Sequence, residues 1–202
     1  MVRQRGHAQA DGAEAALSPG TPARAFALHD TPHSRVTLED FRGRTVVLVF
    51  YVADWQPIAM AQLGLYQELL PHLDRLDAAV LGISSDGTWS HQEFARSIGL
   101  TFPLLSDDAP PGSVARAYGV HVQETGRSKR ALFVIDPDGI VRWRATFPDA
   151  VNPGVDGVLS ALERLPVDGG SQPHSRNGTD GDSCPCGCGL NAALVGQYGR
   201  NA

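Results

Sequence analysis

Cysteine is absent from most of this 202-residue chain, because Cys184, Cys186 and Cys188 all lie near its C-terminal end. A globular part formed by the residues before them therefore has no internal disulfide and no thiol of its own. Long hydrophobic runs are also missing, and none approaches the roughly 18 residues that a membrane-spanning helix needs. The first sixteen residues, MVRQRGHAQADGAEAA, contain no apolar stretch of the kind found in signal peptides. We therefore expect a cytoplasmic protein without a membrane segment.

Charge of one sign is not in large excess. The 17 Lys and Arg residues are interspersed with 22 Asp and Glu residues, which gives a net charge of -5. Such a chain lacks the basic surface that nucleic-acid binding requires. The length allows one ordinary domain with tails, and the composition predicts flexible ends at residues 1–18 and 166–202. The domain itself is expected to span residues 19–165.

A buried strand followed by a helix forms the centre of the predicted fold. Residues 45–51 are a short run of β-branched and aromatic side chains, which is typical of a strand covered on both faces. After a polar turn, apolar residues recur at helical spacing from Ile58 to about Pro71, where the helix should end or bend, with residues 72–76 as an alternative continuation. The start of such a helix favours negative charge, and α/β proteins usually keep their chemistry at such a point.

The rest of the chain alternates between strand and helix patterns. Residues 29–34 are predicted to be a loop, and Ser90 and Asn152 are predicted to cap helices. The expected elements are strands at 79–84 and 104–106, helices at 90–98, 113–118 and 152–165, and a hairpin of residues 131–135 and 140–144. This order predicts an α/β protein with a mixed sheet.

Several segments, taken together and in this order, resemble the peroxiredoxin family, the group of alkyl hydroperoxide reductases and thiol-specific antioxidants. They are FALHDT (26–31), VTLEDFRGR (36–44), VLVFY (47–51), LGISSD (81–86), FPLLSD (102–107), YGV (118–120) and RALFVID (130–136). The resemblance covers roughly residues 19–165. It implies a thioredoxin-like α/β sandwich, a central mixed sheet with helices on both faces.

The active site of that family is a Pro-x-x-x-Thr/Ser-x-x-Cys segment together with a distant arginine. In this chain the resemblance assigns the proline position to Val52, the hydroxyl position to Gln56, the peroxidatic cysteine position to Ala59 and the arginine to Arg130. Alanine has no nucleophile, so the standard mechanism should be absent. Arg130 is expected at the anion-stabilising position, although an arginine entering a strand can also simply pair with a carboxylate such as Asp54.

A second family thiol is also replaced. Some bacterial relatives carry Asp-Gly-x-Trp-Cys-His before the second helix, and here that segment reads DGTWSH (86–91), with Ser90 at the cysteine position. Replacement of both cysteines would fit engineering, but the changes at Val52 and Gln56 favour natural divergence. Read from the residues alone, Asp54 is a turn residue and His91 a surface residue at a helix start. Three further side chains are expected to serve packing: Trp55, Met60 and Trp89.

The segment Ser183-Cys-Pro-Cys-Gly-Cys-Gly places three sulfurs at alternate positions. Thiolates suit zinc or copper, with His174 or a second chain as a further ligand. The Cys-Pro pair also resembles the resolving segment of two-cysteine peroxiredoxins, which suggests thiol exchange. A tethering role and an exposed tail with no dedicated role are the remaining alternatives. For the globular domain no cofactor is expected.

The resemblance leaves three functions open. The first is a peroxiredoxin homologue without the cysteine mechanism, acting as a binding or partner subunit in a homodimer or with an active peroxiredoxin. The second is a thiol peroxidase that uses a tail cysteine and a thioredoxin-like electron donor. The third is a metal-binding protein that uses Cys184, Cys186 and Cys188.

Overall fold

Strand β3 (Thr45–Phe50) lies in the middle of the sheet, and all six of its residues are buried. The protein is described here from a computed structural model, which covers residues 16–165. Strand β3 pairs in parallel with β4 (Ala78–Ser84) and antiparallel with β8 (Arg130–Ile135). Burial on both faces explains the continuous run of β-branched residues, and the strand predicted at 45–51 is confirmed.

The sheet has seven strands in the order β2-β1-β5-β4-β3-β8-β9. Strand β5 (Leu104–Ser106) is parallel to β4, whereas the remaining pairings are antiparallel. The outer strands are β1 (Ala27–Thr31) and β2 (Ser34–Thr37) on one side and β9 (Val141–Phe147) on the other. A small separate ribbon is formed by β6 (His121–Val122) and β7 (Arg127–Ser128). The predicted mixed sheet is thus confirmed.

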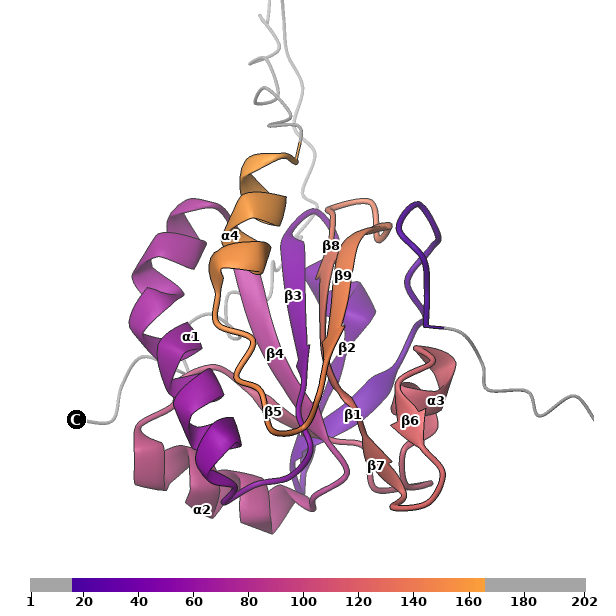
Figure 1. The fold of residues 1–202 in the computed structure, drawn as a ribbon, viewed down its shortest axis with the longest axis vertical. Helices are drawn as coiled ribbons and strands as arrows, with labels where there is room; N and C mark the ends of the chain where they lie inside the picture. The colour runs from indigo at the N-terminus through magenta and orange to yellow at the C-terminus, as the bar shows by residue number, and fades with distance from the viewer. Residues whose placement is uncertain (1–15, 166–202) are drawn as a thin grey trace, which may run out of the picture. The chain divides into compact units, whose positions relative to one another are not determined.

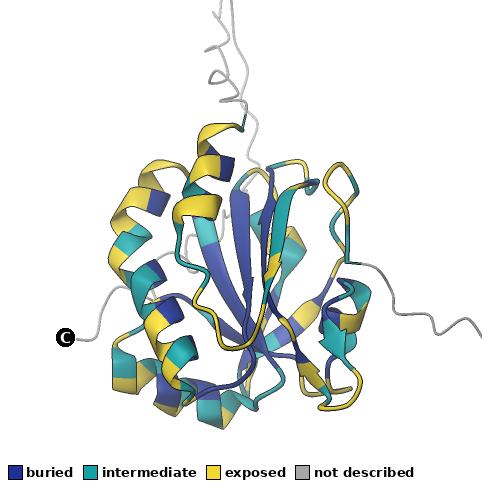
Figure 2. Ribbon diagram, viewed as in Figure 1, coloured by how far each residue is buried: buried dark blue, intermediate teal, exposed yellow. Residues whose placement is uncertain are grey.

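Helices cover both faces of this sheet. Helix α1 (Pro57–Arg75) and helix α4 (Asp156–Glu163) lie to the left of the sheet in Figure 1, and α3 (Ser113–Ala117) lies to its right. Helix α2 (Thr88–Ile98) packs against β5 and β1. Alternate residues of a strand point to opposite faces, so Val46, Leu48 and Phe50 join the core beneath α3. The fully buried β3 appears dark blue in Figure 2.

The loop predicted at residues 29–34 was wrong, because β1 and β2 form a hairpin that pairs Thr31 with Ser34 around a two-residue turn. Residues 38–41 form a short 3-10 helix, η1 (Leu38–Phe41). Of the alternatives at Pro71, the continuation is confirmed, since helix α1 runs to Arg75. The side chain of Pro71 is exposed, so the backbone hydrogen bond that it cannot make lies toward water.

Two predicted helix caps were also wrong. Helix α2 begins after Gly87, and Ser90 lies inside its first turn, where its hydroxyl donates to Asp54 and does not cap the helix. Helix α4 begins at Asp156 rather than at Asn152. The Asn152 Oδ1 atom accepts a hydrogen bond from the backbone N–H of Gly154, which closes a local turn before the helix.

Within the described residues, no helix is both long enough and apolar enough to cross a lipid bilayer.

Candidate functional site

The chain passes from β3 into α1 through a tight turn, residues 51–56. Trp55 adopts a positive φ of 62°, which is uncommon for a residue other than glycine. Gln56 is the N-cap of α1 but makes no side-chain capping bond, and Pro57 occupies the first helical position. Ala59 is therefore in the first turn of α1, where backbone N–H groups have no partner within the helix. Its side chain has no exposed surface.

A buried polar group lies directly beneath this turn, and we call it the Asp54 network. It consists of Tyr51, Asp54, Ser90 and His91. The Tyr51 hydroxyl donates to Asp54 Oδ1 at 2.8 Å, and the Ser90 hydroxyl donates to Asp54 Oδ2 at 2.6 Å. His91 Nδ1 lies 2.9 Å from Oδ2 and 3.1 Å from Oδ1. Because a carboxylate only accepts, these distances place a proton on Nδ1.

The network anchors the turn to the second helix. The backbone N–H of Asp54 donates to Asp86 Oδ2 at 2.8 Å, and Asp86 also accepts from Ser84 at the end of β4. The indole N–H of Trp55 donates to the Ser90 hydroxyl at 3.3 Å. The strand ends of β3 and β4 and the first turn of α2 are thus joined through two carboxylates, those of Asp54 and Asp86.

These surroundings decide the protonation of the network. Burial alone would raise the pKa of Asp54, but the hydrogen bond and charge of His91 and the hydroxyls of Ser90 and Tyr51 outweigh it. The pKa of Asp54 is therefore below its ordinary value, and the group is an anion. Burial, reinforced by the charge of Asp54, raises the pKa of Tyr51 well above the usual value, so its hydroxyl stays protonated.

Arg130 begins β8 beside the carboxyl end of β3 and is completely buried. Its Nη1 donates to Gln62 Oε1, and its Nη2 donates to the carbonyl of Asp149 at 3.2 Å. Burial lowers the pKa of Arg130, and the charge of Asp149 opposes that effect; the guanidinium nevertheless stays protonated at neutral pH. The alternative in which Arg130 pairs with Asp54 was wrong, since Asp54 is held by the network described above.

Gln62 connects Arg130 to the helix that carries Ala59. Residues 59, 62 and 66 lie on the buried face of α1, and all three side chains have no exposed surface. Within residues 16–165, four buried side-chain atoms have no hydrogen-bond partner: Gln62 Nε2, Tyr66 Oη, Arg130 Nε and, in the Asp54 network, His91 Nε2. We call Gln62, Tyr66 and Arg130 the Arg130 cluster.

The strand–turn–helix unit therefore brings together most of the residues that the sequence singled out. Val52 and Ala59 are buried, Gln56 is half-buried, and Ser90 reaches the same turn through Asp54. Arg130 approaches Ala59 through Gln62, which is one helical turn further along. Cys184, Cys186, Cys188 and His174 lie outside the described residues.

Residues 19–144 match the AhpC/TSA family. The chain belongs to this family, the peroxiredoxins. Alkyl hydroperoxide reductase E of Mycobacterium tuberculosis (strain ATCC 25618 / H37Rv) is 38% identical over 128 residues, which are 63% of this chain and 84% of that protein. The thioredoxin-like sandwich predicted from the sequence is confirmed by the solved structures of the family.

Two of those solved structures are equally similar to this chain. Enterococcus faecalis AhpC is 28% identical with a TM-score of 0.66, over 72% of this chain and 90% of that one. The peroxidoxin BcpB of M. tuberculosis is also 28% identical with a TM-score of 0.66, over 73% of this chain and 97% of that one. The described domain is therefore a peroxiredoxin fold over nearly its whole length.

Two residues of this peroxiredoxin were underestimated from the sequence. His91 was expected at the surface, but only 1% of it is exposed. Asp54 was expected to be a simple turn residue, but it accepts hydrogen bonds from three side chains. His91 is one turn before the buried Phe94 on α2, and this spacing was the signal that it faces inward. No comparable signal was present for Asp54, since its partners come from distant segments.

The packing role expected for Trp55, Met60 and Trp89 was largely wrong. Their exposed fractions are 52%, 38% and 72%. The Trp55 ring does contact Phe94 of α2, at 5.4 Å between centroids, although about half of the residue is exposed. We call Trp55, Met60 and Trp89 the apolar rim, because they surround the entrance to α1 and the start of α2.

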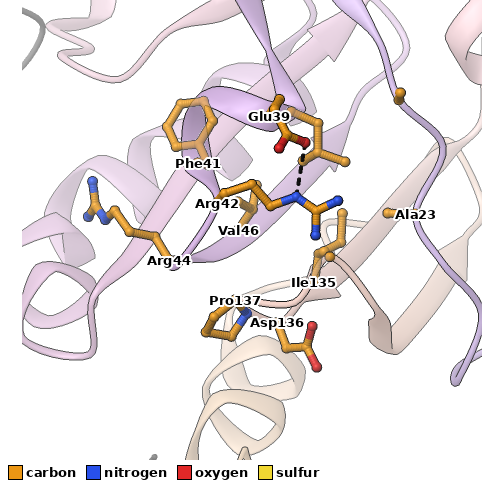
Figure 3. Close-up of a pocket in the computed structure, with 12 residues that line it drawn as sticks. Ala23, Glu39, Phe41, Arg42, Arg44, Val46, Ile135, Asp136 and Pro137 are labelled. Carbon is orange, nitrogen blue, oxygen red and sulfur yellow. Dashed lines mark hydrogen bonds and ion pairs between the residues drawn. The ribbon is translucent and has the colours of Figure 1, made fainter. Parts of the chain in front are cut away.

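A small pocket of about 60 Å³ lies at the other end of β3, near Val46 (Figure 3). Arg42 extends into it and Arg44 points away. The Arg42 guanidinium is already engaged, since Nε donates to Glu39 at 2.9 Å and Nη1 donates to the carbonyl of Asp138 at 2.5 Å. This pocket is therefore structural and separate from the strand–turn–helix site.

Within residues 16–165, no three His, Cys, Asp or Glu side chains form a group able to hold a metal ion. The zinc or copper site predicted for Cys184, Cys186 and Cys188 falls outside these residues and stays a prediction.

Proposed function

We propose that this chain is a peroxiredoxin homologue without a peroxidatic thiol that acts as a non-catalytic binding or partner subunit. The observation that carries this proposal is the residue at the start of α1. Ala59 is buried in the first helical turn, on the same helix face as Gln62, which contacts Arg130. A family site built around a sulfur nucleophile has a methyl group at that position.

The chemistry explains why this substitution matters. In thiol-dependent reduction, a thiolate attacks one oxygen of the hydroperoxide, the O–O bond breaks, and the sulfur is oxidised to a sulfenic acid. The second oxygen leaves as an alcohol or water after it takes up a proton. An alanine methyl group has no electron pair to donate, so neither the helix start nor Arg130 can restore the reaction.

The apolar rim supports a role in binding. Trp55, Met60 and Trp89 expose apolar surface beside a turn that is fixed by the Asp54 network. Aromatic and methionine side chains are enriched at protein interfaces. A rigid, exposed group of this kind suits a protein partner, and the family resemblance favours a second peroxiredoxin chain, either this chain or an active relative.

A tail thiol could in principle supply the missing nucleophile, and the tail cysteines could instead hold zinc or copper. Peroxide consumption by the intact chain with a thioredoxin system tests the first alternative. We expect no turnover above background, both for the intact chain and for the variant in which Cys184, Cys186 and Cys188 are replaced by Ser. Activity in the intact chain alone would support a tail thiol, and activity in both would overturn the proposal.

Metal content of the anaerobically purified full chain tests the remaining alternative. Stoichiometric zinc or copper after loading, lost in the triple-serine variant, would support the metal site. Less than stoichiometric metal would remove it.

The partner role is tested by sedimentation of the full chain, alone and mixed with an active peroxiredoxin from the same source. We expect association that Trp89→Ser and Met60→Ser each weaken at least tenfold. Leu76→Ser is the matched control, because Leu76 is as exposed as Met60, at 38%, but lies at the far end of α1. Equal loss in the control, or no association at all, would contradict the role of the apolar rim.

A further inference from the structure

Met60 carries the only sulfur atom between residues 16 and 165. The chain has two methionines, Met1 and Met60, and its three cysteines all lie after residue 165. Met60 is in the first turns of α1, where its backbone N–H donates to the carbonyl of Gln56 at 3.0 Å, and its side chain belongs to the exposed apolar rim. A thioether can be oxidised to a sulfoxide. In this domain an oxidant therefore has one sulfur to react with, on a residue that solvent reaches.

The neighbours of Met60 on α1 leave it uncovered. A helical side chain lies over the turn that precedes it, so residues 63 and 64 are the ones placed to cover Met60. Leu63 has no exposed surface and packs into the interior, and Gly64 has no side chain. A Cβ atom added at Gly64 would meet nothing within 4 Å, so a larger side chain would have room there.

Gly64 itself has no evident packing role. Glycine inside a helix destabilises it relative to alanine. A glycine is useful in such a place where another group approaches closely or where φ is positive. Gly64 has no close neighbour, and it is not among the glycines with a positive φ. What this residue provides is an open surface beside Met60.

Oxidation of Met60 needs only a hydroperoxide. A lone pair of the thioether sulfur attacks the terminal peroxide oxygen, an S–O bond forms, and the O–O bond breaks. The sulfur loses two electrons and the peroxide gains them. The other oxygen leaves as water or an alcohol after it takes up the proton of the transferred OH group. Return to the thioether requires a methionine sulfoxide reductase, so Met60 reacts once per chain and gives no turnover with a thioredoxin system alone.

We propose that Met60 is a hydroperoxide-responsive modification site, and that its oxidation in the unbound chain makes the apolar rim polar and prevents association with a partner. A sulfoxide is polar, and its formation disrupts interfaces that contain methionine. Burying its oxygen without a hydrogen-bond donor is unfavourable. The neighbouring Ala59 is buried and has no nucleophile, so Met60 is the group of this turn that can respond. The effect on association rests on the proposed function, whereas the modification does not.

The modification is tested in the full-length triple-serine variant, so that thiols do not consume the peroxide. The dilute, unassociated chain is treated with hydrogen peroxide, and the gain of one oxygen in the peptide that contains Met60 is followed by mass spectrometry. Since 38% of the residue is exposed, we expect a rate within about threefold of that of N-acetylmethionine amide. A rate more than about tenfold lower would overturn the proposal.

A matched pair of variants tests the role of the open surface. Gly64→Gln should slow the oxidation of Met60 by about twofold or more, because the new side chain leans back over the preceding turn. Glu68→Gln is the control, since it places the same side chain at an exposed position one turn further on. It should leave the rate unchanged. Equal rates in the two variants would contradict the access argument.

The change in polarity is measured without a partner, by hydrophobic-interaction chromatography of the folded triple-serine chain. Oxidised chain should elute earlier than untreated chain. Met60→Leu cannot form a sulfoxide, so it should elute at one position with and without peroxide. Unchanged retention after complete oxidation of Met60 would overturn the switch.

The effect on association is measured by sedimentation after peroxide treatment and removal of the peroxide. Oxidation should weaken association with the partner by about tenfold or more, whereas treated and untreated Met60→Leu should associate equally. Unweakened association of the fully oxidised chain would overturn the switch. If the retention shift is present but the untreated chain does not associate at all, the proposed function fails and the modification site stands.

Discussion

The Asp54 network and the Arg130 cluster are two buried polar groups beside the same strand end. The first is centred on an anion and the second on a cation. Asp54 is an anion whose two oxygens accept from a tyrosine, a serine and a histidine. Arg130 is a cation that meets only neutral acceptors, and its neighbours carry free donors. In the first group a charged acceptor is paired with three donors, and only His91 Nε2 is without a partner in the described residues; in the second, three buried atoms are without one.

This difference separates two electrostatic environments at one end of the sheet. The Asp54 network fixes the backbone of the turn, since every bond broken leaves a further buried atom without a partner. The Arg130 cluster carries a buried positive charge with fewer hydrogen bonds, so its energy depends more on the charge placed beside it.

Asp54→Asn should produce the largest effect, because it removes the anion from the Asp54 network. Three side chains then lose their charged acceptor in a buried setting. We expect the free energy of unfolding to fall by about 3 kcal/mol, measured by urea denaturation at pH 7. Asp74→Asn, at an exposed position on α1, should change it by less than about 0.5 kcal/mol. Similar losses in both variants would contradict a special role for Asp54.

The difference in the free energy of unfolding between the wild type and Asp54→Asn should depend on pH. The pKa of Asp54 is lowered in the folded state, so its contribution is fully present above the unfolded pKa of about 3.9. It is lost as the pH falls through the lower folded pKa. The stability difference between the wild type and Asp54→Asn should thus be constant from pH 7 to about pH 5 and shrink below about pH 4. A stability difference that is the same at pH 3 as at pH 7 would show that the carboxylate charge does not cause it.

The two regions also differ in how far sequence could predict them. Strand β3 and the β8–β9 hairpin were predictable, because apolar runs and the Asp-Gly turn are local signals. The assignment of family site positions to Val52, Gln56, Ala59 and Arg130 rests on the order of family segments and stays a prediction. The Asp54 network was not predictable, since Tyr51 and Asp54 lie in the turn after β3, whereas Ser90 and His91 belong to helix α2, far along the chain.

The first residues of the helices were harder to predict for a related reason. Ser90 and Asn152 both have the residue type of a cap, yet one bonds to Asp54 and the other to Gly154. A side chain that can cap a helix can also bond to any other group nearby, and tertiary contacts decide between the two. The unpaired donors of Gln62 and Tyr66 had no sequence signal beyond their helical spacing.

Gln62→Glu should have the next largest effect and the opposite sign. The Gln62 oxygen already accepts from the charged guanidinium of Arg130, so a carboxylate there replaces a neutral acceptor by a charged one and forms an ion pair without a change of shape. We expect a gain of about 1 kcal/mol in the free energy of unfolding. Gln92→Glu on the half-buried surface of α2 is the control and should be nearly neutral. A loss of stability in Gln62→Glu would mean that Arg130 already has enough negative charge nearby.

Ser90→Ala should give the smallest change, because it removes one of three donors to Asp54 and leaves the anion in place. The Ser90 hydroxyl donates at 2.6 Å and also accepts from the Trp55 indole, so two bonds are lost at a half-buried position. We expect a loss of about 0.5 to 1 kcal/mol, compared with no measurable change for Ser160→Ala on the exposed side of α4. The loss of a donor should also raise the pKa of Asp54, since Ser90 helps to lower it. The acid limb of the stability curve should therefore move to higher pH in Ser90→Ala, and an unshifted limb would show that His91 and Tyr51 alone set the charge of Asp54.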